Sequence, residues 1–216
     1  SSSVIRAEDL RFNERGVEEV SKKLLMRLDN VYSFYKLYAT SAPIVHHLHS
    51  PHVLDRWIIS RLGELVHETT EGFEKYELDV ATRPLAQFID DLSTWFVRRS
   101  RDRFKEDGED KQYALATLRY VLYTTAHVMA PVMPFFADYL FRNLRDEDDE
   151  ESVHLSEWPS TLRKSFFARL FKRDNDAILK NMADARAIVT QALEARDKVG
   201  IKVRQPLASL SIPSSS

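Results

Sequence analysis

The sequence predicts an all-α protein that folds as an up-and-down bundle of long helices. Only five glycines occur in 216 residues, and long stretches carry apolar side chains three and four positions apart, which is the spacing of one face of an α-helix. Short loops join these stretches, and short loops favour antiparallel packing of consecutive helices. With 44% hydrophobic residues, the chain is able to bury a substantial core.

The first half of the chain predicts three helices. The first covers about Glu14–Ala39, and the aromatic residues in its C-terminal half are predicted to be mostly core. Ser50 before Pro51 predicts the start of the second helix, because serine is a favoured N-cap and proline fits the first helical turn. The third helix is predicted to begin near Leu78, and Pro84 within its pattern should end a first turn or bend the helix.

The second half predicts three further helical segments. A fourth helix is expected at about Lys111–Met129, after an acidic loop that contains a glycine, and a short helix at Phe135–Leu144 follows two prolines. The last helical region covers about Thr161–Val199 and either continues through Arg173–Asn175 or is interrupted there. Gly200 fits the C-cap of this region.

These segments predict one helical domain over residues 4–200, followed at residues 201–212 by the start of an extended or β junction segment. The serine-rich ends, residues 1–3 and 213–216, are predicted to be flexible. No apolar run approaches the roughly 20 residues needed to span a bilayer, and the N-terminus lacks the apolar centre of a signal peptide, so a cytoplasmic protein is expected. The absence of cysteine excludes disulfides and thiolate zinc sites.

The net charge of −2 hides two opposed poles. Arg98–Lys105, called the basic pole below, carries five positive charges and one negative charge. Arg145–Glu151, called the acidic pole, carries one positive and six negative charges. The basic pole predicts contact with an anionic partner, although a solvated helix face with charged neighbours four residues apart would have the same composition.

The basic pole continues a helix that has a clear apolar face. At 100° per residue, Leu92 and Phe96 share one azimuth, and Arg99 and Arg103 extend it. Since arginines cannot follow those side chains into a core, the helix is predicted to extend past its hydrophobic support into solvent. Trp95 lies at the edge of the apolar stripe, where an indole is suited to stacking on a nucleotide base.

Two other clusters suggest chemistry, and each has a plainer interpretation. Asp90 and Asp91 are adjacent, but neighbours on a helix diverge by 100°, which favours solvated groups or arginine partners over a catalytic pair. The most metal-like feature is a loop with no carboxylate at ligand spacing that contains His46, His47, His49 and His52. The sequence has no glycine-rich phosphate loop, nucleophile elbow or HExxH motif, so no catalytic residue and no metal site is predicted.

Several sequence segments, taken together and in order, resemble the anticodon-binding region of class I aminoacyl-tRNA synthetases. They extend over about residues 4–212 and are NVYSFYKLYA, LDRWIISRL, FIDDLSTWFVRRSRDRF, AHVMAPVMPFFADYLF, SVHLSEWP and EARDKVGIKVRQPL. APVMPFFADYLF is shared by the leucine, valine and methionine branches of this family, whereas LYA, RRSRDRF and VRQPL favour the isoleucine branch, the isoleucyl-tRNA synthetases. One departure is Asp29, where relatives usually carry an aromatic residue before the asparagine.

This resemblance implies a helical bundle of the anticodon-binding type that recognises the anticodon stem-loop of an isoleucine tRNA. The same domain of a valyl- or leucyl-tRNA synthetase is the alternative within the family. The family's catalytic domain carries HIGH-type and KMSKS-type signatures, and neither stands in this sequence. The chain is therefore expected to be a fragment that begins after the catalytic core, inactive alone and without a cofactor, whereas the full ligase would use ATP and Mg. The implied partners are tRNA and the catalytic domain of the same parent chain, with no membrane and a monomeric state.

The resemblance also implies which residues face the RNA. Asn30 and Trp95 are expected to face the anticodon loop, with the indole stacking on an unstacked base. The arginines expected to contact phosphates or base edges are Arg98, Arg99, Arg101 and Arg103. A function of another class also remains open, namely a helical protein-interaction module that binds an acidic partner helix through the basic pole.

Overall fold

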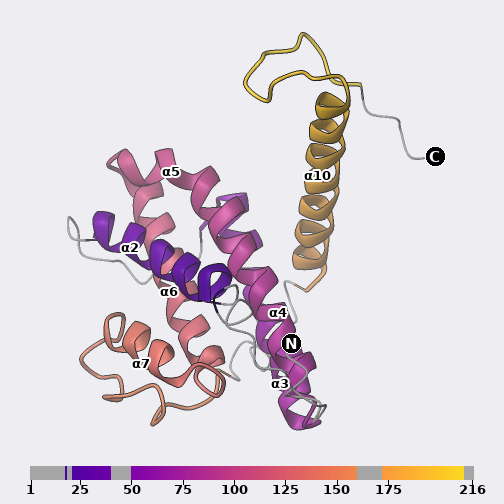
Figure 1. Ribbon diagram of the computed structural model, residues 1–216. Helices are drawn as coiled ribbons and strands as arrows, with labels where there is room; N and C mark the ends of the chain where they lie inside the picture. Colours follow the sequence, from indigo (N-terminus) through magenta and orange to yellow (C-terminus); the bar gives the residue numbers. More distant parts are fainter. Residues whose placement is uncertain (1–17, 19–20, 40–49, 160–171, 212–216) are drawn as a thin grey trace. The chain divides into compact units, whose positions relative to one another are not determined.

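The computed structural model describes residue 18 and residues 21–39, 50–159 and 172–211, and every regular element in these ranges is helical (Figure 1). The prediction of an all-α fold is therefore confirmed. The chain divides between Phe171 and Lys172 into two compact units, called the first and the second unit. No helix in the described ranges is long and apolar enough to cross a membrane.

The described part of the first unit contains α-helices and two π-helical segments, which are labelled η. The elements are η2 (Ser21–Met26), α2 (Arg27–Ala39), α3 (Val53–Glu74), α4 (Leu78–Asp90), η3 (Asp91–Val97), α5 (Arg98–Lys105), α6 (Glu109–Met129) and α7 (Pro134–Arg142). The second to fifth helices predicted from the sequence are confirmed with small shifts at their ends. The first predicted helix is confirmed from Ser21 onward, and most of the part before it lies outside the described residues.

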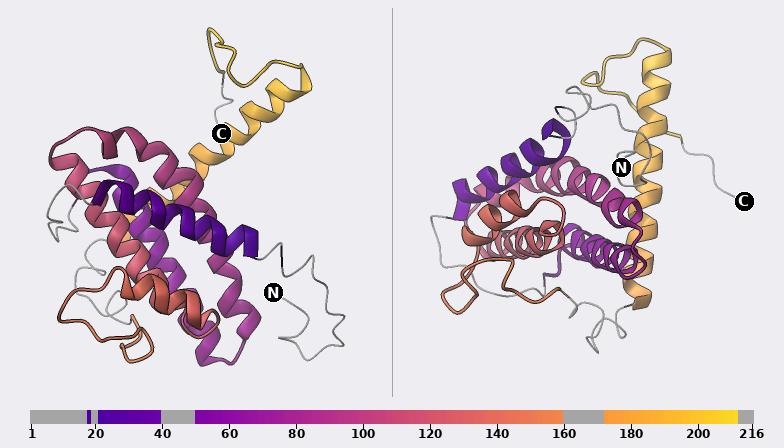
Figure 2. Two further views of the ribbon diagram at one scale, coloured as in Figure 1. Left: turned by 60° about the vertical axis from the view of Figure 1, so that its left-hand side comes forward. Right: turned by 60° about the horizontal axis from the view of Figure 1, so that its bottom comes forward.

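The core of the first unit forms around α6, which packs against α2, α3, α5 and α7 (Figure 2). Most side chains of α6 from Ala114 to Met129 are buried. The other helices add large, fully buried side chains, among them Trp57, Phe88, Phe96, Phe104 and Phe141. Burial of one such side chain stabilises the fold by about 1.5–3 kcal/mol, so this shared core holds the helices in place.

The hairpin of α3 and α4 depends on a close helix approach at Gly72. A Cβ atom at Gly72 would lie 2.5 Å from the backbone nitrogen of Ala81, which is closer than these atoms can approach. In the turn that joins the helices, the exposed Tyr76 adopts the left-handed region at φ 57°. Gly72 therefore sets the separation of the two helices.

The third predicted helix is a continuous segment made of α4, η3 and α5. The helix continues past Pro84, which lies inside α4. The irregularity comes later, in η3, where the backbone N–H of Arg98 donates to the carbonyl of Ser93, five residues earlier. A π turn of this kind inserts an extra residue and rotates all later side chains around the helix axis.

The predicted start of α3 is wrong. Ser50 and Pro51 do not cap the helix, because α3 begins at Val53 and His52 is its N-cap. The imidazole Nδ1 of His52 accepts a hydrogen bond of 3.2 Å from the backbone N–H two residues later. The hydroxyl of Ser50 instead donates to the carboxylate of Asp55 at 2.6 Å, and this buried partner outweighs the local preference for a serine cap.

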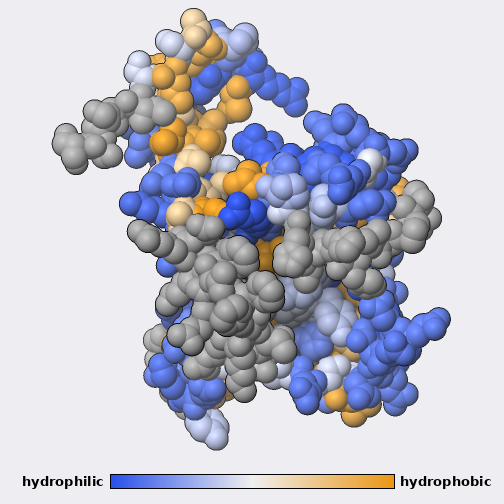
Figure 3. Space-filling model, turned by 180° about the vertical axis from the view of Figure 1, so that it is seen from behind, coloured by the Kyte–Doolittle hydropathy of each residue, from blue (hydrophilic) through white to orange (hydrophobic). Residues whose placement is uncertain are grey.

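The described part of the second unit consists of α10 (Lys172–Lys198) and the segment that follows it. The helix is continuous through Arg173–Asn175, and residues 161–171 of the predicted helical region lie outside the described residues. Hydrophobic residues gather on the surface of this unit (Figure 3), where Val199, Val203 and Leu210 are exposed.

The C-terminus of α10 is closed by a Schellman motif, as Gly200 predicts. Gly200 has φ 70°, its N–H donates to the carbonyl of Asp197 at 3.0 Å, and the next N–H donates to the carbonyl of Arg196 at 2.9 Å. The guanidinium of Arg196 also donates to the carbonyl of Lys202 at 2.6 Å. No strand forms within residues 201–211, which follow this cap as an irregular segment.

Candidate nucleic-acid interface

Helix α2 runs beside the segment formed by η3 and α5 (Figure 1), and contacts at both ends of α2 establish this arrangement. The guanidinium of Arg27, the first residue of α2, forms an ion pair with the carboxylate of Asp90. Near the other end, the rings of Phe34 and Tyr38 lie 5.0 and 5.9 Å from the ring of Phe104, measured between centroids. The two segments therefore run in the same direction, and the N-terminal half of α2 lies level with η3.

Asn30 lies in this N-terminal half of α2 and has an exposed side chain. Its amide can both donate and accept hydrogen bonds, which is what recognition of a base edge requires. The neighbouring aromatic residues Tyr32 and Tyr35 are buried, in agreement with their predicted core role. Burial raises the pKa of the Tyr35 phenol to about 12, so Tyr35 stays protonated at neutral pH.

Trp95 belongs to η3, and its side chain is half-buried. The guanidinium carbon of Arg99, one turn later on the helix, lies 5.5 Å from the centre of the indole ring. This distance is that of a cation–π contact. One face of the indole is therefore covered by the guanidinium of Arg99.

Three arginines of the basic pole, Arg98, Arg99 and Arg101, are exposed. In the part of the chain that the structure describes, no carboxylate forms an ion pair with any of the three. The prediction that these three side chains extend into solvent is confirmed. Exposed arginines without carboxylate partners are the groups with which proteins neutralise phosphates.

The prediction that the helix extends past its hydrophobic support is wrong at Arg103 and Phe104. Phe104 is 0% exposed, and the side chain of Arg103 is 11% exposed. The π turn of η3 explains the difference, because one inserted residue rotates later positions by about 100°. Ser100 and Phe104 consequently take the buried azimuth that a regular helix would give to Arg99 and Arg103.

Arg103 connects the end of α5 to the beginnings of α3 and α6. Its guanidinium donates to both carboxylate oxygens of Asp55 at 2.8 Å and to both of Asp110 at 2.7 Å. Burial opposes the charge of Arg103, but its hydrogen bonds to these carboxylates outweigh that cost and raise its pKa. The same bonds lower the pKa of the Asp110 carboxyl. The RNA contact of Arg103 stays a prediction, while its ion pairs make it an anchor for the basic pole.

Asp90 and Asp91 are partners of arginines, which is one of the two interpretations that the sequence favoured. Asp91 is fully buried and accepts a hydrogen bond of 3.0 Å from Nε of Arg61 on α3. Asp90 pairs with Arg27 on α2. Because the two carboxylates bind arginines on different helices, they act separately and hold α4 and η3 against their neighbours.

The histidine loop is described only at His52, the N-cap of α3. The other members, His46, His47 and His49, lie outside the described residues. Within the described ranges, no group of three or more histidine, aspartate or glutamate side chains is arranged to hold a metal ion.

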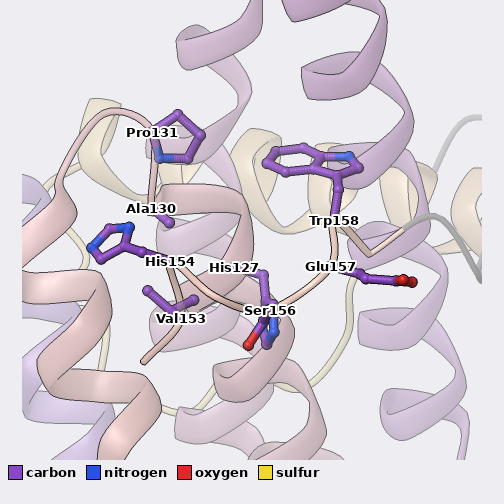
Figure 4. Close-up of a pocket in the computed structure, with 8 residues that line it drawn as sticks. All are labelled: His127, Ala130, Pro131, Val153, His154, Ser156, Glu157 and Trp158. Atoms are coloured by element: carbon purple, nitrogen blue, oxygen red, sulfur yellow. The ribbon is translucent and has the colours of Figure 1, made fainter. Parts of the chain in front are cut away.

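A pocket of about 250 Å³ lies between the C-terminal end of α6 and residues 153–158 (Figure 4). His127 contributes to it from α6, where its Nδ1 lies 2.9 Å from the carbonyl oxygen of Tyr123. Burial lowers the pKa of His127, which favours the neutral imidazole. His154 and Glu157 point in opposite directions in Figure 4, so these two side chains do not converge on a common point.

The structure also shows a neighbour of the basic pole that sequence patterns did not identify. Asp55 is 0% exposed although it carries a charge, and it anchors the basic pole through Arg103. The sequence does contain a signal for this buried charge, because Asp55 shares the helix face of the apolar residues Ile58 and Leu62. A carboxylate within an apolar stripe requires a buried cation. The identity of that cation could not be found from helical spacing.

Residues 55–212 match the family described as the anticodon-binding domain of tRNA ligase. The match covers more than half of the chain and includes nearly all of α3 through α10 together with the basic pole. The chain belongs to the family of anticodon-binding domains of tRNA ligases.

Within this family, the chain is similar to isoleucine–tRNA ligases. It is 38% identical to the enzyme of Chlamydia trachomatis serovar D and 40% identical to that of Chlamydia muridarum, over 98% of this chain and 20% of each relative. The isoleucine–tRNA ligase of Chlamydia pneumoniae is 37% identical over the same shares. The chain thus spans about a fifth of the length of the curated relatives it matches. The resemblance found from the sequence segments is confirmed.

Proposed function

We propose that the first unit binds the anticodon stem-loop of an isoleucine tRNA as part of an isoleucine–tRNA ligase. One observation carries the proposal: three exposed arginines without carboxylate partners in the described chain lie within two turns of the half-buried Trp95. The helix that bears them packs beside α2, which exposes Asn30 at the level of η3. Family membership and the similarity to isoleucine–tRNA ligases support this proposal.

The proposed roles follow from the chemistry of each group. Arg98, Arg99 and Arg101 supply positive charge for phosphates and donors for base edges. The amide of Asn30 forms hydrogen bonds with a base edge, and the Trp95–Arg99 pair supplies a surface for stacking. Arg103 belongs to the predicted contact set, but its ion pairs with carboxylates limit how far it can reach.

The remaining proposals concern the whole ligase and come from the relatives. The complete protein would join isoleucine to its tRNA with ATP and Mg, and this domain would work with a catalytic domain of the same chain. A monomeric state and a cytoplasmic location are part of the same proposal. The described residues of this chain supply the recognition surface.

Binding of an isoleucine tRNA anticodon stem-loop, measured by filter binding at two salt concentrations, tests the proposed function. We expect Trp95→Ala and Arg98→Ala to weaken binding about fivefold or more, because they remove stacking surface and a phosphate partner. Arg83→Ala is the matched control, since Arg83 is an exposed arginine on α4 outside the basic pole. Equal affinities for the three variants and the unchanged chain would contradict the proposed site.

A protein-interaction module that binds an acidic helix is the second candidate, because the same exposed arginines would serve it. Competition separates the two functions. If the proposal is correct, unlabelled isoleucine stem-loop displaces the labelled RNA at low concentration, whereas polyglutamate competes only weakly and loses its effect as salt rises. Polyglutamate that competes as well as the stem-loop at every salt concentration would favour the interaction module.

A further inference from the structure

The contact between Trp95 and Arg99 restricts how a nucleotide base can approach this site. The indole is half-buried against the first unit, and the guanidinium of Arg99 covers one of its faces at 5.5 Å. A base that stacks on this covered face of Trp95 must first displace Arg99. Displacement would cost a cation–π contact that is already formed.

The outer face of the Arg99 guanidinium offers a platform that requires no such rearrangement. Arg99 is exposed, and no carboxylate among the described residues holds it by an ion pair. A guanidinium is planar and delocalised, so it stacks on an aromatic ring with one face and on a base with the other. A second cation–π pair among the described residues, Lys36 over Tyr32 at 4.5 Å, lacks such a plane because an ammonium group is compact.

We propose that Arg99 carries the stacked base and that Trp95 is a positioning residue beneath it. An unpaired base of the anticodon loop would lie on the outer face of the guanidinium, in the order indole, guanidinium, base. Arg98 and Arg101 leave the helix at other azimuths and would bind phosphates. This inference rests on the proposed function and changes the role of Trp95 within it.

Substitution of Arg99 by lysine tests the stacking role, because lysine keeps the charge and removes the plane. We expect Arg99→Lys to weaken stem-loop binding about tenfold, with the slope of log affinity against log salt unchanged. The matched control Arg83→Lys, at an exposed arginine on α4 outside the basic pole, should change affinity less than twofold. An Arg99→Lys variant that binds as tightly as the unchanged chain would overturn the proposal.

A double-mutant cycle tests the positioning role of Trp95. We expect Trp95→Leu to weaken binding severalfold in the unchanged chain and to have no further effect in the Arg99→Lys background, because Trp95 acts through Arg99. Equal losses in both backgrounds would show that the base touches the indole directly, which overturns the proposal. The thermal midpoint of each variant, measured alongside, identifies any loss that comes from unfolding.

A fluorescent base provides a readout that a merely structural role of Trp95 would not change. With 2-aminopurine placed in turn at each loop position, Arg99→Lys should increase the fluorescence of the stacked position in the bound RNA, and Arg83→Lys should leave it unchanged. Unchanged fluorescence at every position in the Arg99→Lys complex would contradict the inference alone. Failure of the unchanged chain to bind any stem-loop at low salt would instead contradict the proposed function itself.

Discussion

Buried carboxylates in the first unit are neutralised by arginines from other helices. Asp55 on α3 is held by Arg103 on α5, and Asp91 in η3 is held by Arg61 on α3. A buried charge that loses its partner cannot regain solvation, so removal of either arginine is costly. The arginines of the basic pole therefore fall into two groups. Arg98, Arg99 and Arg101 are exposed and can bind RNA, whereas Arg103 is held by carboxylates of the first unit.

Arg103→Met should reduce the free energy of unfolding by about 3 kcal/mol, because it leaves Asp55 buried with, among the described residues, the Ser50 hydroxyl as its remaining partner. Arg101→Met is the matched control on the same helix and should change stability by less than about 0.5 kcal/mol, since Arg101 is exposed. Urea unfolding followed by circular dichroism measures both values. Equal stabilities for the two variants would show that Arg103 is not an anchor.

At the scale of the elements, two features of the helices position the basic pole. The π turn of η3 rotates α5 so that Phe104 enters the core and Arg99 and Arg101 remain outside. The close approach of α3 and α4 at Gly72 holds the segment that leads into η3. Displacement of either helix would therefore move Trp95 relative to α2.

Gly72→Ala should destabilise the first unit by about 1–3 kcal/mol, because the added Cβ would collide with the backbone of Ala81 at 2.5 Å. Gly63→Ala on the same helix is the matched control. Apart from the neighbouring backbone of α3 itself, no described atom lies within 4 Å of a Cβ at Gly63, so alanine there should stabilise α3 by about 0.5–1 kcal/mol. Thermal unfolding distinguishes them, and a stabilising Gly72→Ala variant would show that the two helices can separate without cost.

At the scale of the first unit as a whole, its two charged poles lie far apart. In Figure 1, α5 lies at the top of the unit and the loop that follows α7 lies at the bottom, and Figure 2 also separates them. The acidic pole is held in place by Arg119, which donates to Asp146 at 2.7 Å. Charge of opposite sign is thus kept away from the proposed RNA surface, although the net charge is only −2.

Three exposed acidic residues of the acidic pole can be neutralised together. We expect this triple variant to change stem-loop affinity less than twofold at physiological salt; its substitutions are Asp148→Asn, Glu150→Gln and Glu151→Gln. Screening over about 8 Å isolates the poles from each other. The matched variant replaces Arg98, Arg99 and Arg101 by alanine, changes the same number of charges and should abolish measurable binding. A large increase in affinity on neutralisation would show instead that the acidic pole approaches the RNA.

Much of the fold could be predicted because its signals are local. Helical periodicity identified most of the helices, and Gly200 marked the end of α10 by the conformation it alone adopts easily. The candidate site was predicted in part: Arg98, Arg99 and Arg101 are exposed as expected, whereas Arg103 is not. The prediction at Arg103 failed because it extended a regular helix through η3, where a π turn shifts every later residue.

Composition, helical spacing and ordered sequence segments are properties of the linear chain, and they were enough to predict the all-α class, the density of charge at each pole and the family to which the chain belongs. Which of those charges are available to a partner depends on tertiary packing. The reason is that ion pairs join distant residues: Arg103 meets Asp55 across 48 positions, and Arg61 meets Asp91 across 30. Which side chain meets which at such separations depends on how the helices pack.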